Sequence, residues 1–184
     1  TAHTGIDAIA HALETAVSNK RSEISSGYSL AAWRLLDQGL ERVLTHPDDL
    51  EARARMQLGA AFAVAGIENS MLGIAHSCAN PLTAHFGIVH GQAVGTMLPH
   101  VIEFNERDST SSGVYASLAG GRNLPDRVRF HLQQSSMDLS LHSLGVDEAM
   151  IPQLAQEAAT QWTAQFNPVP VTSALLEEVY RAAL

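Results

Sequence analysis

Hydrophobic residues recur at intervals of three and four along most of the chain, which is the spacing that places them on one face of an α-helix. The first such segment runs from Gly5 to about Val17, with Ile6, Ile9 and Leu13 on its apolar face. The same spacing predicts further helices over about residues 24–44 (or 28–44), 49–79, 91–104, 125–144, 147–166 and 173–184.

Proline, glycine and short polar runs mark the ends of these segments. His46-Pro47 and Asn80-Pro81 predict helix ends, because proline cannot continue the backbone hydrogen-bond ladder. The polar run 106–113 and the Gly-rich run 120–123 predict loops that are too short to separate domains. We therefore expect a single helical bundle over residues 1–184.

Three glycines, Gly59, Gly66 and Gly73, stand seven residues apart in the predicted helix over residues 49–79. In one helix they would share nearly one face. Each glycine costs about 1 kcal/mol relative to alanine. We expect this cost to serve the close approach of another helix rather than a ligand.

The composition supports an all-α fold. The chain has 27 alanines and 21 leucines, whereas Phe, Trp and Tyr together make up 5%. Alanine and leucine lose least on entering a helix, and strands favour β-branched and aromatic residues. An all-α bundle is therefore the expected fold class.

The charge excludes some function classes. The net charge is −8, so the chain lacks the positive field that attracts nucleic acid or anionic lipid. Cys78 is the single cysteine, which excludes a disulfide scaffold and a thiolate cluster. The sequence contains no run of about 18 apolar residues, which is the length that a membrane span needs. We expect a soluble, cytoplasmic protein that binds neither nucleic acid nor membranes.

Histidines carry the candidate chemistry. Asp7 and His11 lie one helical turn apart, so their side chains leave one face of the first predicted helix. His76 and His90 flank the predicted turn between two later helices, so their imidazoles can converge. One carboxylate and three imidazoles suit Fe(II) or Zn(II). A surface ion pair and a hydrogen-bonded core histidine remain the alternatives from spacing alone.

Several stretches resemble the iron-containing (group III) alcohol dehydrogenases. The segment Gly5–Glu14 is similar to the first metal-binding helix of that family. The other similar segments are His76–Leu82, Val89–Gly91 and Met97–His100 in the second signature, with Asn167–Pro170 and Leu175–Leu184 at the C-terminus. The resemblance covers essentially the whole chain. It implies the C-terminal domain of the dehydroquinate synthase-like/iron-containing alcohol dehydrogenase fold.

The resemblance implies that Asp7, His11, His76 and His90 hold Fe(II), sometimes replaced by Zn(II), in a cleft facing an N-terminal nucleotide-binding domain. Asn80 stands where the family commonly has a histidine near the nicotinamide. An amide cannot titrate near neutral pH, so proton shuttling at this candidate catalytic position is in doubt. The alternative for Asn80 is a cap for the C-terminal end of its helix.

The remaining histidines and the cysteine have expected structural roles. We expect His85 in a surface loop, although it is close enough in sequence to take part in the site. Cys78 is expected to pack in the core. The histidines expected to be structural or solvated are His3, His46, His100, His131 and His142.

No glycine-rich phosphate-binding motif occurs, although hydride transfer needs NAD(P). The chain starts six residues before Asp7 without a methionine. We therefore expect the C-terminal half of a longer enzyme, inactive alone, whose partner is its own N-terminal nucleotide-binding domain. Assembly as a homodimer is left open.

The expected function is interconversion of a small-molecule alcohol and an aldehyde or ketone by an NAD(P)-dependent, iron-type alcohol dehydrogenase. Two alternatives lie within the wider family: an enzyme like glycerol dehydrogenase, which uses zinc with fewer protein ligands, and one like maleylacetate reductase. A third is a stand-alone helical metal-binding module with no catalysis.

Overall fold

The computed structural model describes residues 1–184, and every regular element in it is helical, which confirms the predicted all-α fold. Nine α-helices and two short 3₁₀ helices follow one another in this order: α1 (Ala2–Val17), α2 (Glu23–Thr45), α3 (Leu50–Glu68), α4 (Ile74–Phe86), α5 (His90–Asn105), α6 (Ser109–Ala119), α7 (Leu124–Gln134), η1 (Glu148–Met150), α8 (Ile151–Thr160), η2 (Trp162–Phe166) and α9 (Ser173–Ala182). None of these helices has both the length and the apolar character needed to cross a membrane.

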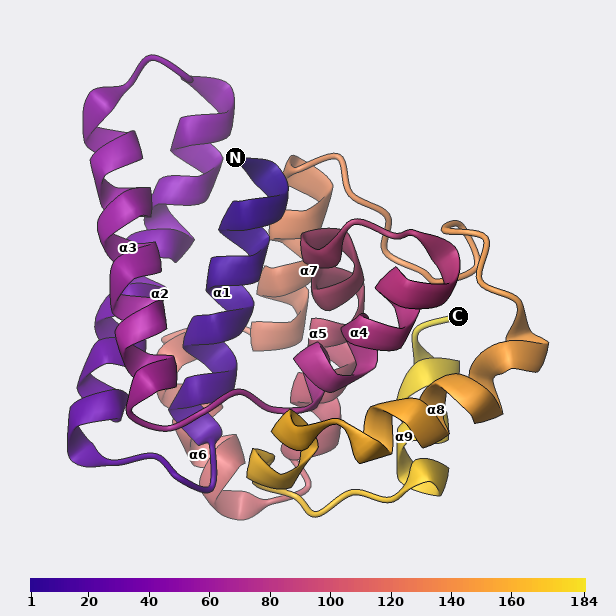
Figure 1. The fold of residues 1–184 in the computed structure, drawn as a ribbon. Helices are drawn as coiled ribbons and strands as arrows, with labels where there is room; N and C mark the ends of the chain where they lie inside the picture. The colour runs from indigo at the N-terminus through magenta and orange to yellow at the C-terminus, as the bar shows by residue number, and fades with distance from the viewer.

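Helix α1 runs through the middle of the molecule. It packs against α2 and α3 on one side and against α5 on the other (Figure 1). Its predicted apolar residues Ile6, Ile9 and Leu13 are fully buried. Helix α4 packs on α5 and α8, and α8 packs on α9, so the C-terminal helices extend the core away from α2 and α3. Residues of α1, α4 and α5 therefore meet inside the bundle.

The prediction of one long helix over residues 49–79 is wrong, because the helix is interrupted between α3 and α4. Asn69 donates its side-chain amide to the Ala65 carbonyl at 2.8 Å, and the Ser70 hydroxyl donates to the Gly66 carbonyl at 2.8 Å. These side chains satisfy carbonyls that a continuing helix would have used. Met71 then adopts φ 113°, which a right-handed helix does not permit.

The helix end predicted at Asn80-Pro81 is also wrong. Pro81 lies inside α4, where it is buried, and the helix continues to Phe86. Gly87 ends it instead, with φ 66° in the left-handed region and its N–H donated to the Thr83 carbonyl. A glycine in this conformation is a common helix terminator because it carries no Cβ.

Later segments differ in detail from their predicted bounds. Residues 106–113 are not all loop, because Asp108 caps α6 by accepting hydrogen bonds from the Ser111 N–H and hydroxyl, both at 2.8 Å. The predicted helix over 125–144 ends at Gln134, and that over 147–166 is interrupted at Gln161. Capping by a polar side chain explains the start of α6 in an otherwise polar run.

The packing role expected for the glycines holds at two positions. A Cβ on Gly59 would lie 2.8 Å from the Leu36 side chain of α2. A Cβ on Gly66 would lie 3.1 Å from Thr15 Oγ1 of α1. Gly73 is not on the same helix: it caps α4 and faces the Glu14 carboxylate.

A buried ion cluster ties α2 to α7. Asp37 Oδ1 accepts hydrogen bonds from Arg127 Nε at 2.6 Å and His131 Nε2 at 2.9 Å, and Oδ2 accepts one from Arg122 at 3.1 Å. Burial alone would raise the pKa of Asp37, but these hydrogen bonds and the charge of Arg127 outweigh it and lower the pKa. The fold therefore holds this carboxylate charged.

Asp37→Asn is expected to lower the free energy of unfolding by about 3 kcal/mol at neutral pH, because it removes one partner of a buried ion pair. Since the pKa of Asp37 is lowered by folding, its contribution is complete above the unfolded value near 3.9 and is lost as the pH falls below it. Urea unfolding at about pH 7, 5 and 3.5 measures this, and the deficit of the variant should shrink only at the lowest pH. Asp48→Asn, at an exposed residue without an ion pair, is the control. An equal loss in both variants contradicts the assignment.

Met71→Gly is expected to raise the free energy of unfolding by about 1 kcal/mol, because glycine adopts positive φ at little cost. The comparison variant is Ser136→Gly, at an exposed residue with φ 54°, where the gain should be smaller. Both are read from thermal unfolding. If the Met71→Gly protein is less stable, the packing of the half-buried methionine side chain stabilises the fold by more than the positive φ of its backbone destabilises it.

Candidate metal centre

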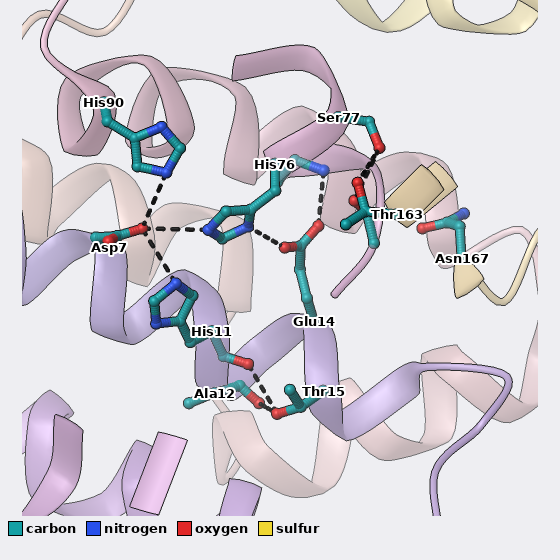
Figure 2. Close-up of polar contacts among 12 residues, drawn as sticks. Asp7, His11, Ala12, Glu14, Thr15, His76, Ser77, His90, Thr163 and Asn167 are labelled. Atoms are coloured by element: carbon teal, nitrogen blue, oxygen red, sulfur yellow. Dashed lines mark hydrogen bonds and ion pairs between the residues drawn. The ribbon is translucent and has the colours of Figure 1, made fainter. Parts of the chain in front are cut away.

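The four residues expected to bind metal lie together in the structure, around one carboxylate oxygen. Asp7 Oδ1 is 3.2 Å from His76 Nε2, 3.4 Å from His11 Nε2 and 3.6 Å from His90 Nε2 (Figure 2). The rings of His11 and His76 are stacked at 4.8 Å between centroids. Three segments far apart in the sequence thus present their polar tips to one point.

The local structure of each segment explains this convergence. Asp7 and His11 are one turn apart on α1, as the sequence predicted. His76 lies in the first turn of α4, so the break between α3 and α4 points it at α1. His90 is the first residue of α5, after the left-handed turn at Gly87.

Gly91 permits the close approach that brings His90 to Asp7. A Cβ on Gly91 would lie 2.2 Å from the backbone oxygen of His3 and 2.7 Å from its carbonyl carbon. Backbone atoms cannot rotate away as a side chain can, so α1 and α5 come this close only because residue 91 lacks a side chain. Gly91 is not one of the three regularly spaced glycines that the sequence pattern singled out.

Glu14 is part of the site, although the sequence identified no role for it. Its side chain is buried and contacts His76 Nδ1, and its Oε1 accepts a hydrogen bond from the Ala75 N–H at 2.7 Å (Figure 2). The signal was its spacing: Glu14 follows Asp7 by seven residues and His11 by three, so all three share one face of α1.

The electrostatics of the cluster follow from burial and from the two carboxylates. Burial works against the protonated form of His76, but Glu14 and Asp7 outweigh it and raise the pKa of His76 to about 9. Burial and the neighbouring His76 lower the pKa of His11 to about 4, and burial lowers that of His90. Burial alone would raise the pKa of Asp7, but the hydrogen bond with His76 and the charges of nearby imidazoles lower it. At neutral pH the imidazoles of His11 and His90 are therefore neutral and that of His76 is protonated, and a bound cation would displace a proton of His76.

The donor set fits a borderline divalent cation. Ligand atoms about 2.1 Å from a tetrahedral ion lie about 3.4 Å from one another, which is the range of the distances to Asp7 Oδ1. Ligand atoms of Asp7, His76 and His90 lie within 4.8 Å of one another, and His11 joins them through Asp7. His76 is 6% exposed and His90 41%, so the cluster is closed at α4 and open beside α5.

The other candidate residues lie outside this cluster. Asn80 is an exposed residue within α4 that donates a hydrogen bond to Gln161 Oε1 at 3.1 Å. The alternative role as a helix cap is therefore wrong, because α4 continues for six residues beyond it. His85 is on the surface as expected but in α4 rather than a loop, and it pairs with Glu157 at 2.8 Å.

Two residues expected to be structural are indeed buried. His131 is fully buried and pairs with Asp37. Cys78 is also fully buried, and burial raises the pKa of its thiol to about 12, so it is not a reactive thiolate.

Comparison with known proteins shows the family to which the chain is similar. A family model described as "Fe-containing alcohol dehydrogenase family, C-terminal" matches residues 1–184. Long-chain-alcohol dehydrogenase 1 of Geobacillus thermodenitrificans is 29% identical to this chain, over all of the chain and 50% of that protein. The chain spans about half the length of the curated relatives it matches.

Solved structures share the fold. An iron-containing alcohol dehydrogenase from Thermococcus thioreducens matches 98% of this chain and 49% of its own, with TM-score 0.88 and 25% identity. A maleylacetate reductase from a Rhizobium strain matches all of this chain and 52% of its own, with TM-score 0.87 and 23% identity. The second likeness shows the fold alone.

Gly91→Ala is expected to weaken Zn(II) binding about tenfold or more, because the new methyl group separates α1 from α5 and moves His90 away from Asp7. Competition titration with a chromophoric chelator measures the affinity. Gly113→Ala in α6 is the matched control, because its Cβ would meet nothing within 4 Å. It should leave the affinity unchanged and stabilise the fold by about 0.5 kcal/mol. Unchanged affinity in Gly91→Ala would show that the approach of α1 and α5 does not set the site.

Proposed function

The chain belongs to the Fe-containing alcohol dehydrogenase family, and we propose that it forms the metal-binding half of an NAD(P)-dependent alcohol dehydrogenase. The substrate class is a small alcohol and its aldehyde or ketone. The observation that carries the proposal is the convergence of three imidazole Nε2 atoms on one Asp7 oxygen, at 3.2–3.6 Å.

Asp7, His11, His76 and His90 are the proposed ligands. Nitrogen and oxygen donors in this ratio suit Fe(II) or Zn(II), while calcium and magnesium require more oxygens. When bound, such an ion supplies Lewis acidity toward a substrate oxygen, and NAD(P) supplies the hydride chemistry. The match to the Fe-containing alcohol dehydrogenase family favours iron over zinc.

The proposed ligand side chains differ in their exposure to solvent. His76 and His11 are largely enclosed, so they shield the centre from water on the side of α4 and α1. His90 is 41% exposed, so the substrate oxygen approaches on this side. A second, nucleotide-binding domain covering the open side would exclude water during hydride transfer. We propose that the N-terminal half, which the longer relatives have beyond this chain, is that domain.

Asn80 is proposed as a hydrogen-bonding residue rather than a proton-transferring one. Its amide can donate to or accept from a nicotinamide or substrate, but it cannot gain or lose a proton near neutral pH. It is exposed and one helical turn beyond His76, so it is accessible from solvent or from a covering domain.

His76→Ala and His90→Ala in the full-length protein are each expected to lower the metal content from about one ion per chain to less than a tenth, and to abolish turnover. Elemental analysis of protein prepared without chelators or a nickel column measures the metal. His85→Ala is the matched control, because His85 is on the same helix as His76 but pairs with Glu157 on the surface. Full metal content and normal activity in both ligand variants would refute the proposal.

A further inference from the structure

The second carboxylate beside His76 belongs to Glu14, which is 3% exposed. One of its oxygens, Oε1, accepts a hydrogen bond from the Ala75 N–H at 2.7 Å, at the start of α4. The other, Oε2, contacts His76 Nδ1 (Figure 2). Glu14 thus links α1 both to the backbone of α4 and to the ring of a proposed ligand.

The chemistry of this contact determines which nitrogen of His76 carries the proton. An ionised carboxylate can only accept hydrogen bonds, so Nδ1 must donate. In a neutral imidazole the other nitrogen, Nε2, then carries the lone pair. Nε2 is the atom that lies 3.2 Å from Asp7 Oδ1, at the centre of the cluster.

We propose that Glu14 is a positioning residue of the metal centre: by accepting the Nδ1 proton of His76, it holds that ring in the tautomer and orientation that present Nε2 to the cation. This inference rests on the proposed function. Partners of this kind fix the orientation of ligand histidines and raise their basicity.

The surroundings of Glu14 require a carboxylate rather than an amide. Both of its oxygens face donors, the Ala75 N–H and the Nδ1–H of His76. A glutamine would place its NH₂ group against one of these donors or force the proton of His76 onto Nε2. Either result works against binding of a cation at Nε2.

Gly73 leaves room for the carboxylate of Glu14. A Cβ on Gly73 would lie 3.0 Å from Glu14 Oε1 and 3.1 Å from Asn167 Oδ1, so a side chain at residue 73 would crowd both groups. Asn167 is itself held by reciprocal hydrogen bonds with Asn105, at 2.7 and 3.1 Å. The carboxylate of Glu14 is therefore buried and contacts both the Ala75 N–H and His76 Nδ1.

Glu14→Gln in the full-length protein tests the proposal. We expect Zn(II) affinity, measured by competition with a chromophoric chelator, to fall about 10- to 100-fold. The visible spectrum of the Co(II)-loaded variant should also change, because one ligand is lost or misoriented. Glu157→Gln is the matched control. It alters a partly exposed carboxylate on α8 that pairs with His85, a histidine on α4 outside the cluster, and it should leave both measurements unchanged.

A measurement on the unaltered protein separates positioning from a merely structural role, and it holds even where the variant does not fold. The ¹⁵N chemical shifts of His76 in the Zn(II)-loaded protein should show a protonated Nδ1 and a metal-bound Nε2. Metal bound at Nδ1, or no proton on Nδ1, would overturn the inference.

The two proposals fail in different ways. Unaltered protein that binds no Zn(II) or Fe(II) contradicts the proposed function itself. Unaltered protein that binds the metal, with a Glu14→Gln variant of equal affinity and spectrum, contradicts only the role of Glu14.

Discussion

The close approach of helices α1 and α5 is the constraint on which the rest of the site depends. Gly91 lets the backbone of α5 lie against that of His3, and Gly95 leaves room for the Ile6 and Leu132 side chains at 2.6 and 2.7 Å from where its Cβ would be. Without side chains at these positions, the start of α5 reaches the start of α1. The imidazole at position 90 thereby comes within 3.6 Å of Asp7.

Burying ionisable groups at this junction is costly unless each is paired, and the structure pairs them in two separate clusters. In one, the carboxylates of Asp7 and Glu14 surround the ring of His76. In the other, Asp37 is held by two arginines and a histidine between α2 and α7. The second cluster is closed by its own cations, whereas the first leaves three imidazole nitrogens directed at one oxygen. This difference makes the first a candidate for a cation and the second a part of the fold.

Much of the fold follows from patterns along the chain, and the errors have a local physical origin. Helical spacing identified α1, α5 and α9 closely, because their apolar faces are regular. It joined α3 to α4 because residues 69–73 contain no proline, and the break instead depends on side chains that bond to helix carbonyls. The sequence pattern also predicted a helix end at Pro81, but Pro81 is buried inside α4, and the helix continues to Phe86. Capping by Asp108 likewise produced a helix where composition indicated a loop.

The sequence by itself determined the helical class, the pairing of Asp7 with His11 on one face, and the family resemblance that singled out His76 and His90. These properties depend on residue type and on short spacings, which a helix converts directly into geometry. Only the tertiary structure decided that three segments meet at one carboxylate oxygen, and that Glu14 faces the ring of His76. Those contacts join residues more than sixty positions apart, so they depend on how closely the helices pack, and that is set by glycines whose neighbours cannot be identified before the chain has folded.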